Sequence, residues 1–288
     1  MKKIESVFSS PHSHWVGDGF PVKTLFSYQQ QGQSISPFLL LDHAGPMQFY
    51  PSEHQRGVGE HPHRGFETVT IVYQGEVAHK DSTGEKGVIG EGDVQWMTAA
   101  SGILHEEFHS NAFAETGGVL EMMQLWVNLP KVDKMSAPKY QEIKAKQIPS
   151  VALPDKTGFL RVIAGQLANK KGPASTHSPI LVADGEIKTS GHYHLPLQNG
   201  WTTIVVVRDG QLKLNGKILS KNQTLAISGS DHGLSIEALS DSKLLILSGK
   251  PIDEPIIGYG PFVMNSEAEI KQAITDYQTG KFGRLTRI

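Results

Sequence analysis

Short stretches of alternating or β-branched apolar residues recur along the first half of the chain. They cover residues 36–43, 66–73, 77–81, 94–98, 103–105 and 119–127. Valine, isoleucine and threonine favour extended strands, and turns rich in glycine and aspartate separate these stretches about every 8–12 residues. Short strands at this spacing are typical of β-sandwiches and β-barrels, so the pattern predicts an all-β fold.

A second block of the same kind follows. Its apolar stretches cover residues 160–165, 179–183, 201–207, 211–214, 224–227 and 243–247. The strand-turn-strand pattern at 205–212 is similar to that at 71–77, which indicates a weak internal repeat. Residues 131–150 are polar and lysine-rich and form the best linker candidate. We therefore predict two β-rich domains, residues 1–135 and 136–288.

The last element of the chain has helical periodicity. Ser266 and Glu269 have the spacing of a capping box, and Gly280 is suited to close the helix. The apolar positions between them follow one helical face and are Ile270, Ala273, Ile274 and Tyr277. The pattern predicts a short helix over about residues 266–279 that packs through this face.

Composition narrows the classes of function. The chain has 288 residues, a net charge of −2 and no cysteine. It lacks the basic surplus of a nucleic-acid-binding protein, and no apolar stretch is long enough for a membrane span. The absence of cysteine excludes disulfides and thiolate-bound metals and fits a reducing cytoplasm. Because no apolar run follows the basic residues near Met1, we expect no signal peptide and a cytoplasmic protein.

Two pairs of metal-ligating residues stand out against this background. His61 and His63 are two positions apart, as are His105 and Glu107. Positions two apart on a strand share a face, so all four side chains can meet in one cavity while Glu106 points away. Three imidazoles and one carboxylate suit iron(II), manganese, nickel or zinc. The spacing therefore predicts a mononuclear metal site.

Other polar residues near these pairs are weaker candidates. His109 shares the parity of His105 and Glu107 and lines the cavity only if the strand continues inward. Arg64, His79, Trp96 and Gln124 lie on expected strands or turns nearby and are expected mainly to pack or face solvent.

A further pair of histidines, His192 and His194, occurs in the second block. Only the single His232 follows it, in a turn-like context. Two ligands do not complete a metal site, so we expect none in the second domain.

The chain resembles the pirin family of the cupin superfamily. The resemblance rests on residues 61–69, 92–99 and 102–105, on 36–39 near the start, and on 260–265 before the final helix. It implies a bicupin, that is, two tandem jelly-roll β-barrels followed by a short C-terminal helix. It also implies a single metal, usually Fe²⁺, in the N-terminal barrel, with none in the C-terminal barrel.

The family's ligand motif carries over onto His61, His63, His105 and Glu107. Glu67 is an alternative carboxylate ligand, because many single-domain cupins use a glutamate at this place and its sequence parity matches His61 and His63. Pirins are thought to use the later glutamate, and this sequence is expected to follow them.

The resemblance implies quercetin 2,3-dioxygenase activity, in which dioxygen cleaves the ring of a flavonol. In that case Glu107 serves as both ligand and general base, and no organic redox cofactor is required. The alternative is an iron-dependent regulatory protein that binds other proteins and responds to the oxidation state of iron. Another small-molecule activity of the cupin type is the third reading.

Overall fold

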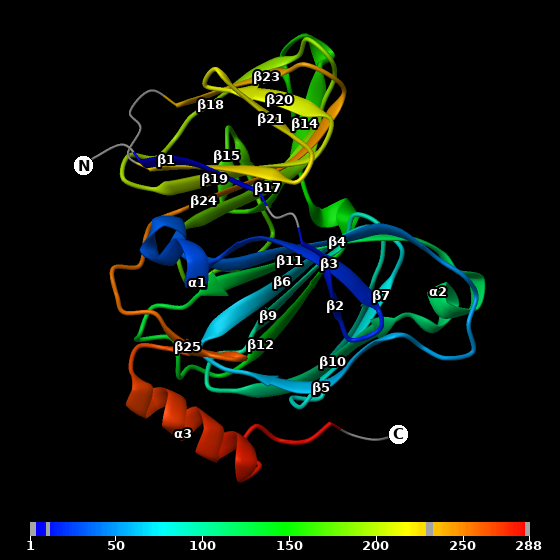
Figure 1. Cartoon of the computed structure of the whole chain (residues 1–288), viewed down its shortest axis with the longest axis vertical. Helices are drawn as coiled ribbons and strands as arrows, with labels where there is room; N and C mark the ends of the chain where they lie inside the picture. Colours follow the sequence, from blue (N-terminus) through cyan, green and yellow to red (C-terminus); the bar gives the residue numbers. More distant parts are fainter. Residues whose placement is uncertain (1–3, 10–11, 229–232, 286–288) are drawn as a thin grey trace. The chain divides into compact units, whose positions relative to one another are not determined.

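The computed structural model describes residues 4–9, 12–228 and 233–285, and most of their regular structure consists of antiparallel β-strands (Figure 1). The chain divides into two compact units that are not contiguous in sequence. Unit 1 comprises Met1–Pro11, Leu25–Phe38 and Lys146–Pro251, and unit 2 comprises His12–Thr24, Leu39–Ala145 and Ile252–Ile288. Each unit pairs a seven-stranded sheet with a four-stranded sheet, so the expected all-β fold with a short C-terminal helix is confirmed.

Unit 2 contains the candidate metal ligands. In sheet order, its seven strands are β12 (Lys139–Ile143), β9 (Val94–Thr98), β6 (Phe66–Gln74), β11 (Gly118–Asn128), β4 (Phe38–Phe49), β3 (Phe20–Ser27) and β2 (His14–Val16). Its four-stranded sheet runs β5 (Gly57–His63), β10 (Ile103–His109), β7 (Val77–Asp81) and β8 (Lys86–Ile89). A short helix, α2 (Asn111–Thr116), connects β10 to β11, so the two sheets are joined directly behind the second ligand pair.

Unit 1 repeats this arrangement strand for strand. Its seven strands are β1 (Ile4–Ser9), β22 (Gln223–Ser228), β19 (Thr202–Asp209), β24 (Ser242–Gly249), β17 (Ile180–Ile187), β14 (Gly158–Ala164) and β13 (Ser150–Ala152). Its four strands are β18 (His192–Leu195), β23 (Leu234–Ala238), β20 (Gln211–Leu214) and β21 (Lys217–Ser220). The equal order of strands explains the internal repeat in the sequence.

Short elements complete the fold. They are α1 (Tyr28–Gln31), η1 (Gly32–Ile35), η2 (Ala145–Gln147), η3 (Pro154–Lys156) and the hairpin of β15 (Gln166–Leu167) with β16 (Lys170–Lys171). Within the described part of the chain, no helix is long and apolar enough to cross a membrane.

The interiors of the two units differ in chemistry. The largest core cluster described in unit 1 is aliphatic and includes Leu195, Leu212, Leu234 and Ile236 from its four-stranded sheet. In unit 2 an apolar cluster that includes Phe20, Val72 and Met122 fills part of the interior. The inward positions of β5 and β10 instead include polar side chains that can bind a metal or a substrate.

The polar stretch 131–150 is folded rather than a free linker. Within it, β12 pairs with β9 and forms the edge of the large sheet. Lys134 is only 1% exposed, and its ammonium group donates to the Gly65 carbonyl (2.7 Å), Asn128 Oδ1 (2.7 Å) and the Val263 carbonyl (2.9 Å). Three oxygen acceptors match the three N–H donors of the ammonium group, which is how a lysine can be buried here.

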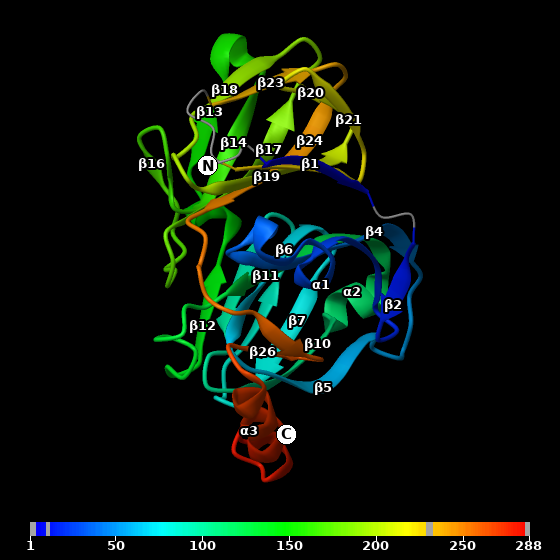
Figure 2. The ribbon, with the colours of Figure 1, turned by 60° about the vertical axis from the view of Figure 1, so that its left-hand side comes forward.

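The C-terminal segment belongs to unit 2, the unit with the candidate metal ligands. It consists of the hairpin β25 (Ile257–Tyr259) and β26 (Phe262–Met264) and the helix α3 (Glu267–Gln278) (Figure 2). The contiguous division at residues 135 and 136 stays a prediction about the sequence, but the compact units cross it, because α3 belongs to unit 2 and β1 belongs to unit 1.

Helix α3 confirms the sequence signals at its ends. Ser266 is the N-cap and accepts from the Glu269 backbone N–H at 3.3 Å, and Gly280 follows the last turn with a φ of 77°. Ile270 and Ala273 are buried with Phe262, Met264 and Phe282, but Tyr277 is 40% exposed. The buried face includes Asp276 instead, whose carboxylate contacts Nη1 of the buried Arg64 at 2.9 Å.

Candidate metal centre

Three neighbouring strands bring the candidate ligands to one face of the small sheet. In the register of β10 with β5, His105 lies opposite His61. In the register of β10 with β7, His105 lies opposite Asp81 and Glu107 lies opposite His79. Residues directly opposite each other in antiparallel strands project from the same face. The inner face of this sheet therefore carries His61, His63, His79, His105, Asp81 and Glu107 around one site, with His109 farther along β10.

A bulge in β5 helps to aim this strand at the site. His61 lies opposite His105, yet the next opposed pair is Val58 with Glu107, so β5 contains an extra residue there. Bulges bend a strand and re-aim side chains, and they are common next to active sites. Here the bulge lets Val58 and His61, three residues apart, both border the same cavity.

Two groups of side chains are close enough to hold a metal ion. The ligand atoms of His61, His63 and His105 lie within 4.8 Å of one another, and so do those of His79, His105 and Glu107. A metal–nitrogen bond of about 2.1 Å places opposite ligands about 4.2 Å apart. His105 belongs to both groups, and it is buried at their centre.

Orphaned nitrogen atoms show that these residues fit a metal. Nδ1 of His63 and Nε2 of His105 are buried and have no hydrogen-bond partner. Buried polar atoms are normally satisfied, so unsatisfied ones require an explanation such as an ion. Two orphaned imidazole nitrogens in one cluster provide the lone pairs that a transition metal needs.

Partners of the other ring nitrogens set the orientation of the imidazoles. His61 Nδ1 lies 2.8 Å from the Gly59 carbonyl, to which it donates, leaving Nε2 as the acceptor. His79 Nε2 lies 3.0 Å from Asp81 Oδ2, and His79 Nδ1 lies 3.5 Å from His105 Nδ1. This chain assigns the proton of His105 to Nδ1 and the lone pair to Nε2, the orphaned atom. Such outer partners commonly fix metal-binding histidines.

The electrostatics keep the central imidazoles neutral. Burial lowers the pKa of His63 and His105 well below the ordinary histidine value, and the neighbouring His61 lowers both further. Burial opposes the ionisation of Asp81, but hydrogen bonds from His79 and Thr83 outweigh this and lower its pKa. A neutral imidazole is the form that binds a metal, so His63 and His105 need not release a proton first.

Glu107 reaches from the small sheet to the large one. Its Oε1 accepts a hydrogen bond from Gln95 Nε2 at 3.0 Å and lies 3.3 Å from Thr70 Oγ1. Gln95 also lies 3.4 Å from the hydroxyl of Tyr140, whose ring stacks on His79. Both of these contacts involve Oε1 of Glu107, which leaves its Oε2 for a metal or a substrate proton.

A cavity of about 350 Å³ opens beside the histidines. His61, His63 and Glu107 form one side of it, and Phe20, Met122 and Trp126 provide apolar walls. Asp42 also lines it and accepts from Thr24 Oγ1 at 2.6 Å. Its volume lies within the range of about 300–1,000 Å³ usual for small-molecule sites. The site therefore joins a metal-ligand cluster to space for an organic molecule.

Family models match both halves of the chain. The model described as Pirin matches residues 19–127, and the model described as Pirin C-terminal cupin domain matches residues 182–283. The chain belongs to the pirin family. A relative from Pseudomonas aeruginosa, provisionally named quercetin 2,3-dioxygenase, is 58% identical over 99% of both chains. Human pirin is 34% identical over 87% of this chain and 84% of its own.

Solved structures are also similar to this chain. The crystal structure of a quercetin 2,3-dioxygenase from Acinetobacter baumannii is 54% identical, covers 98% of both chains and has a TM-score of 0.95. A pirin from Escherichia coli in complex with nickel(II) is 20% identical, with a TM-score of 0.68, over 86% of this chain and all of its own. The second likeness extends to the fold alone.

Two residues that the sequence offered as candidates for the metal site, Glu67 and His109, lie outside both groups of ligands. Glu67 belongs to neither group of ligands among the described residues and accepts from Thr98 Oγ1 at 2.7 Å. It lies three positions from Thr70 on β6 and therefore projects from the opposite face of the strand. The turn at Gly65, with a φ of 90°, separates β5 from β6, so the parity of His61 and His63 does not carry over to Glu67. The alternative ligand set with Glu67 is not supported.

His109 packs among aromatic rings. Its ring lies 4.6 Å from that of Phe49 and 5.2 Å from that of Phe113, and its Nε2 lies 3.0 Å from the Gly19 carbonyl. It is absent from both ligand groups, so its role in the described structure is packing.

Sequence reasoning assigned His79 to packing and missed Asp81. Both face the cluster because β7 lies beside β10, a pairing that no local pattern in the sequence specifies. The alternation of His79 and Asp81 on one strand was the only available signal.

The histidine pair of the second barrel faces away from its interior. His192 and His194 are exposed, whereas Tyr193 and Leu195 between them pack with Ile236 and Leu234 in the aliphatic core. His232 lies outside the described residues. Within the described part of the chain, no group of metal ligands occurs in unit 1.

Proposed function

We propose that this pirin is a metal-dependent dioxygenase of the quercetin 2,3-dioxygenase type, with His61, His63, His105 and Glu107 as ligands of one divalent metal. The observation that carries the proposal is the pair of orphaned imidazole nitrogens on His63 and His105 beside a cavity of ligand size. The names of the two most similar relatives described above support the same activity.

Iron(II) is the metal we propose, and manganese, nickel and zinc suit the same donors. Three neutral imidazoles and one carboxylate are borderline ligands, which favours these ions over calcium or magnesium. When bound, the metal supplies positive charge that stabilises a deprotonated substrate oxygen.

The apolar walls hold the substrate rings. A flavonol is planar and carries several hydroxyl groups, and Trp126 and Phe20 offer aromatic surface for its rings. Asp42 is 8% exposed and offers a carboxylate that accepts a hydrogen bond from a phenolic hydroxyl. The buried walls also exclude water from the reacting ring.

Glu107 is the general base in this proposal. Gln95 donates to Oε1, so Oε2 is the atom that takes the proton of the 3-hydroxyl group of the flavonol. Loss of that proton makes the ring electron-rich, which is the condition for attack by dioxygen.

An assay with defined metals tests the function. Protein stripped of metal is reloaded without oxygen with iron(II), manganese(II), nickel(II) or zinc(II) and then mixed with quercetin and dioxygen. We expect flavonol loss, oxygen consumption and carbon monoxide release with at least one metal and none with stripped protein. Glu107→Gln should bind quercetin yet turn it over at least about 100-fold more slowly, with Glu106→Gln as the matched control.

The alternative function predicts a different result. If every loaded form binds its metal stoichiometrically but none cleaves quercetin, the dioxygenase proposal is wrong. Capture of a protein partner by the iron(III) form and not by the iron(II) form would then favour the iron-dependent regulator.

A further inference from the structure

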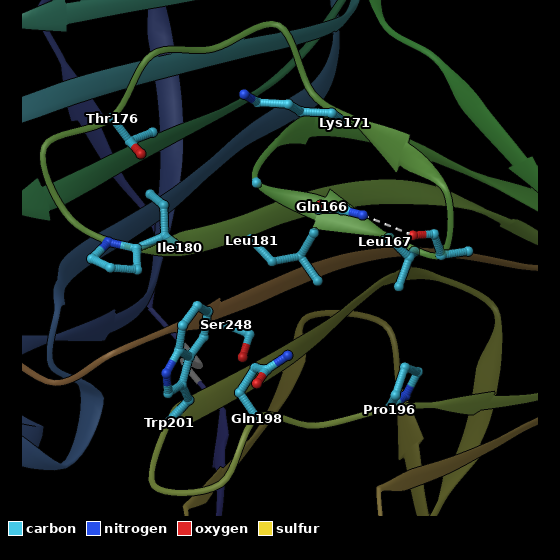
Figure 3. A pocket seen from close by; sticks show the side chains of 13 residues that line it. Gln166, Leu167, Lys171, Thr176, Ile180, Leu181, Pro196, Gln198, Trp201 and Ser248 are labelled. Carbon is cyan, nitrogen blue, oxygen red and sulfur yellow. Dashed lines mark hydrogen bonds between the residues drawn. The ribbon is translucent and has the colours of Figure 1, made fainter.

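Unit 1 contains a second cavity that the proposed function does not use. Its volume is about 730 Å³, roughly twice that of the cavity beside the histidines. It lies between the β15–β16 hairpin, the start of β17 and the loop that precedes β19 (Figure 3). No histidine, aspartate or glutamate lines it. The chemistry of its walls therefore suits an organic ligand and not a metal.

The floor of this cavity is rigid and apolar. Leu167 and Leu181 line it and are buried members of the aliphatic core of the second barrel. Pro179, Ile180 and Pro196 extend the apolar surface. Side chains packed in a core keep their positions, so this floor is formed before any ligand arrives.

An aromatic side chain forms one wall. Trp201 is only partly buried, and in Figure 3 its indole lies at the side of the cavity next to Ile180 and Gln198. An indole offers a broad face on which a planar ring can stack, and this contact is favourable beyond the area that it buries. The wall therefore favours a ligand with an aromatic ring.

The charge of the lining is positive. Lys171 is the single ionisable side chain among the lining residues. Lys171 is exposed, and in Figure 3 its ammonium group lies on the side of Thr176, away from Trp201. Because no acidic residue lines the cavity beside it, this cation favours an anionic group on the ligand.

Amide groups provide the remaining polar contacts. Gln166 donates through Nε2 to the Ala168 carbonyl at 3.2 Å, which fixes its side chain at the rim of the cavity (Figure 3). Gln198 lines the wall beside Trp201. A few placed polar groups within apolar walls are the usual composition of a small-molecule site.

We propose that this cavity binds an aromatic carboxylate, with its ring on Trp201 and its carboxylate at Lys171. The proposal is independent of the metal centre, because every lining residue belongs to unit 1. Failure of the dioxygenase assay therefore leaves it untouched, and its own failure leaves the proposed function untouched.

Calorimetric titration of the full-length, metal-loaded chain with 2-naphthoate tests the proposal. The uncharged 2-naphthamide is the matched ligand. We expect one naphthoate site per chain in this cavity and at least about tenfold weaker binding of the amide, because a charge-assisted hydrogen bond is lost. Lys171→Gln should weaken naphthoate binding by about tenfold or more and leave amide binding unchanged.

Matched variants separate this site from non-specific binding. Lys170→Gln removes the neighbouring exposed lysine of the same hairpin, which does not line the cavity, and should leave naphthoate binding unchanged. Trp201→Ala should weaken both ligands, whereas Trp201→Phe should retain most of the affinity because it keeps an aromatic face.

Three results would overturn the proposal. The first is an equal loss with Lys170→Gln and Lys171→Gln, which would indicate general charge attraction. The second is unchanged binding in folded Trp201→Ala protein. The third is loss of naphthoate binding in Trp126→Ala, since Trp126 lines the other cavity and its loss would place the ligand there.

Discussion

At the residue scale, the imidazoles of the cluster differ in what holds them. His61 is oriented by a backbone carbonyl, whereas His105 is oriented by His79 and, through it, by Asp81. His63 has no partner at Nδ1. A metal would satisfy His63 and His105 at once, and the cost of leaving both buried nitrogens unsatisfied favours binding.

Removal of a ligand should remove the metal. We expect His63→Ala and His105→Ala to lose most of the bound metal, because each deletes an imidazole from the cluster. Glu106→Ala should retain it, because Glu106 lies on the other face of β10, where its Oε1 is 3.7 Å from Lys80 Nζ. Elemental analysis of the purified variants measures this, and equal loss from Glu106→Ala would contradict the assigned face.

Asp81 should affect the metal without touching it. Asp81→Asn replaces one acceptor of the carboxylate by an amide, so the asparagine can no longer satisfy both His79 and Thr83. The proton arrangement that leaves His105 Nε2 free is then weakened. We expect metal affinity to fall by about 10–100-fold, the usual effect of removing an outer partner.

Competition with a coloured chelator measures that affinity. Lys80→Gln, at the neighbouring position of β7 but on its outer face, is the matched control and should have little effect. An Asp81→Asn protein with unchanged metal affinity would show that the chain from Asp81 through His79 to His105 does not orient the ligand.

At the element scale, the C-terminal segment holds the turn that follows His63. Arg64 Nη1 contacts Asp276 of α3, and Arg64 Nε donates to the Ser101 carbonyl at 2.7 Å. Lys134 ties the Gly65 carbonyl to that of Val263 in β26. Burial lowers the pKa of Lys134 to about 7, although the negative charges of Glu254 and Glu269 oppose this shift. The end of β5 is therefore held by the hydrogen bonds of two buried side chains, Arg64 and Lys134.

The ion pair of α3 should make the stability of unit 2 depend on pH in acid. Hydrogen bonds from Lys281, Gln272 and Arg64 lower the pKa of Asp276 to about 2. A carboxyl whose folded pKa lies below its unfolded value stabilises the fold above that unfolded value, near 3.9, and loses this contribution as pH falls towards 2. We expect thermal unfolding temperatures to fall across this window more steeply in the parent than in Asp276→Asn.

The same variant should be destabilised at neutral pH. Asp276→Asn leaves the buried Arg64 without its counter-ion, and breaking a buried pair costs about 3 kcal/mol. Denaturant unfolding measures this loss. Glu267→Gln, on an exposed position of the same helix, is the control and should change stability by less than about 1 kcal/mol. Similar losses in both variants would argue against a special role of Asp276.

Local sequence patterns predicted helices and strands better than they predicted which distant segments or side chains these contact. The ends of α3 followed from Ser266 and Gly280, since capping involves only neighbouring residues. Strand β12 was hidden in a polar, lysine-rich stretch because an edge strand with exposed sides needs no apolar alternation. The burial of Asp276 was also hidden, because its partner Arg64 lies 212 residues away in the sequence.

The same holds for the candidate site: its local features were predictable from the sequence, and its long-range pairings were not. Parity within a strand placed His61 with His63 and His105 with Glu107, and the structure brings these pairs to one face. Parity failed for Glu67, because the turn at Gly65 lies between it and β5. His79 and Asp81 depend on which strand lies beside β10, and that is set by the whole barrel.

At the scale of the whole molecule, two barrels of one topology have different interiors. The inward pairs of β18 and β23 are Tyr193 with Ile236 and Leu195 with Leu234, and they pack in a continuous core. The corresponding sheet of unit 2 carries the histidines. The two units thus share one strand order, whereas the chemistry of their interiors differs.

We therefore expect one metal per chain. The double variant His192→Ala/His194→Ala should retain the full metal content, because both side chains are exposed and no second group of ligands accompanies them in the described residues. Elemental analysis combined with protein quantification gives the stoichiometry. Two metals in the parent chain, falling to one in the double variant, would contradict the assignment of the site to unit 2 alone.

The exchange of segments between units predicts that a simple cut will fail. A fragment of residues 1–135 retains the four proposed ligands but lacks β12, Pro261 at the cavity, and the partners of Arg64 and Lys134 at Asp276 and Val263. Arg64 would then lose its carboxylate partner and Lys134 one of its three acceptors, so the end of β5 would be held less firmly. We expect this fragment to be unfolded or to bind metal at least about 100-fold more weakly than the full chain.

Co-expression of residues 1–135 with residues 136–288 supplies the missing segments and is the matched control. Recovery of metal binding in the co-purified pair, measured by elemental analysis and by circular dichroism, is the expected result. A fragment 1–135 that folds alone and binds metal as tightly as the full chain would show that the C-terminal hairpin and α3 are dispensable, and that the division at residues 135 and 136 describes the molecule better than its compact units do.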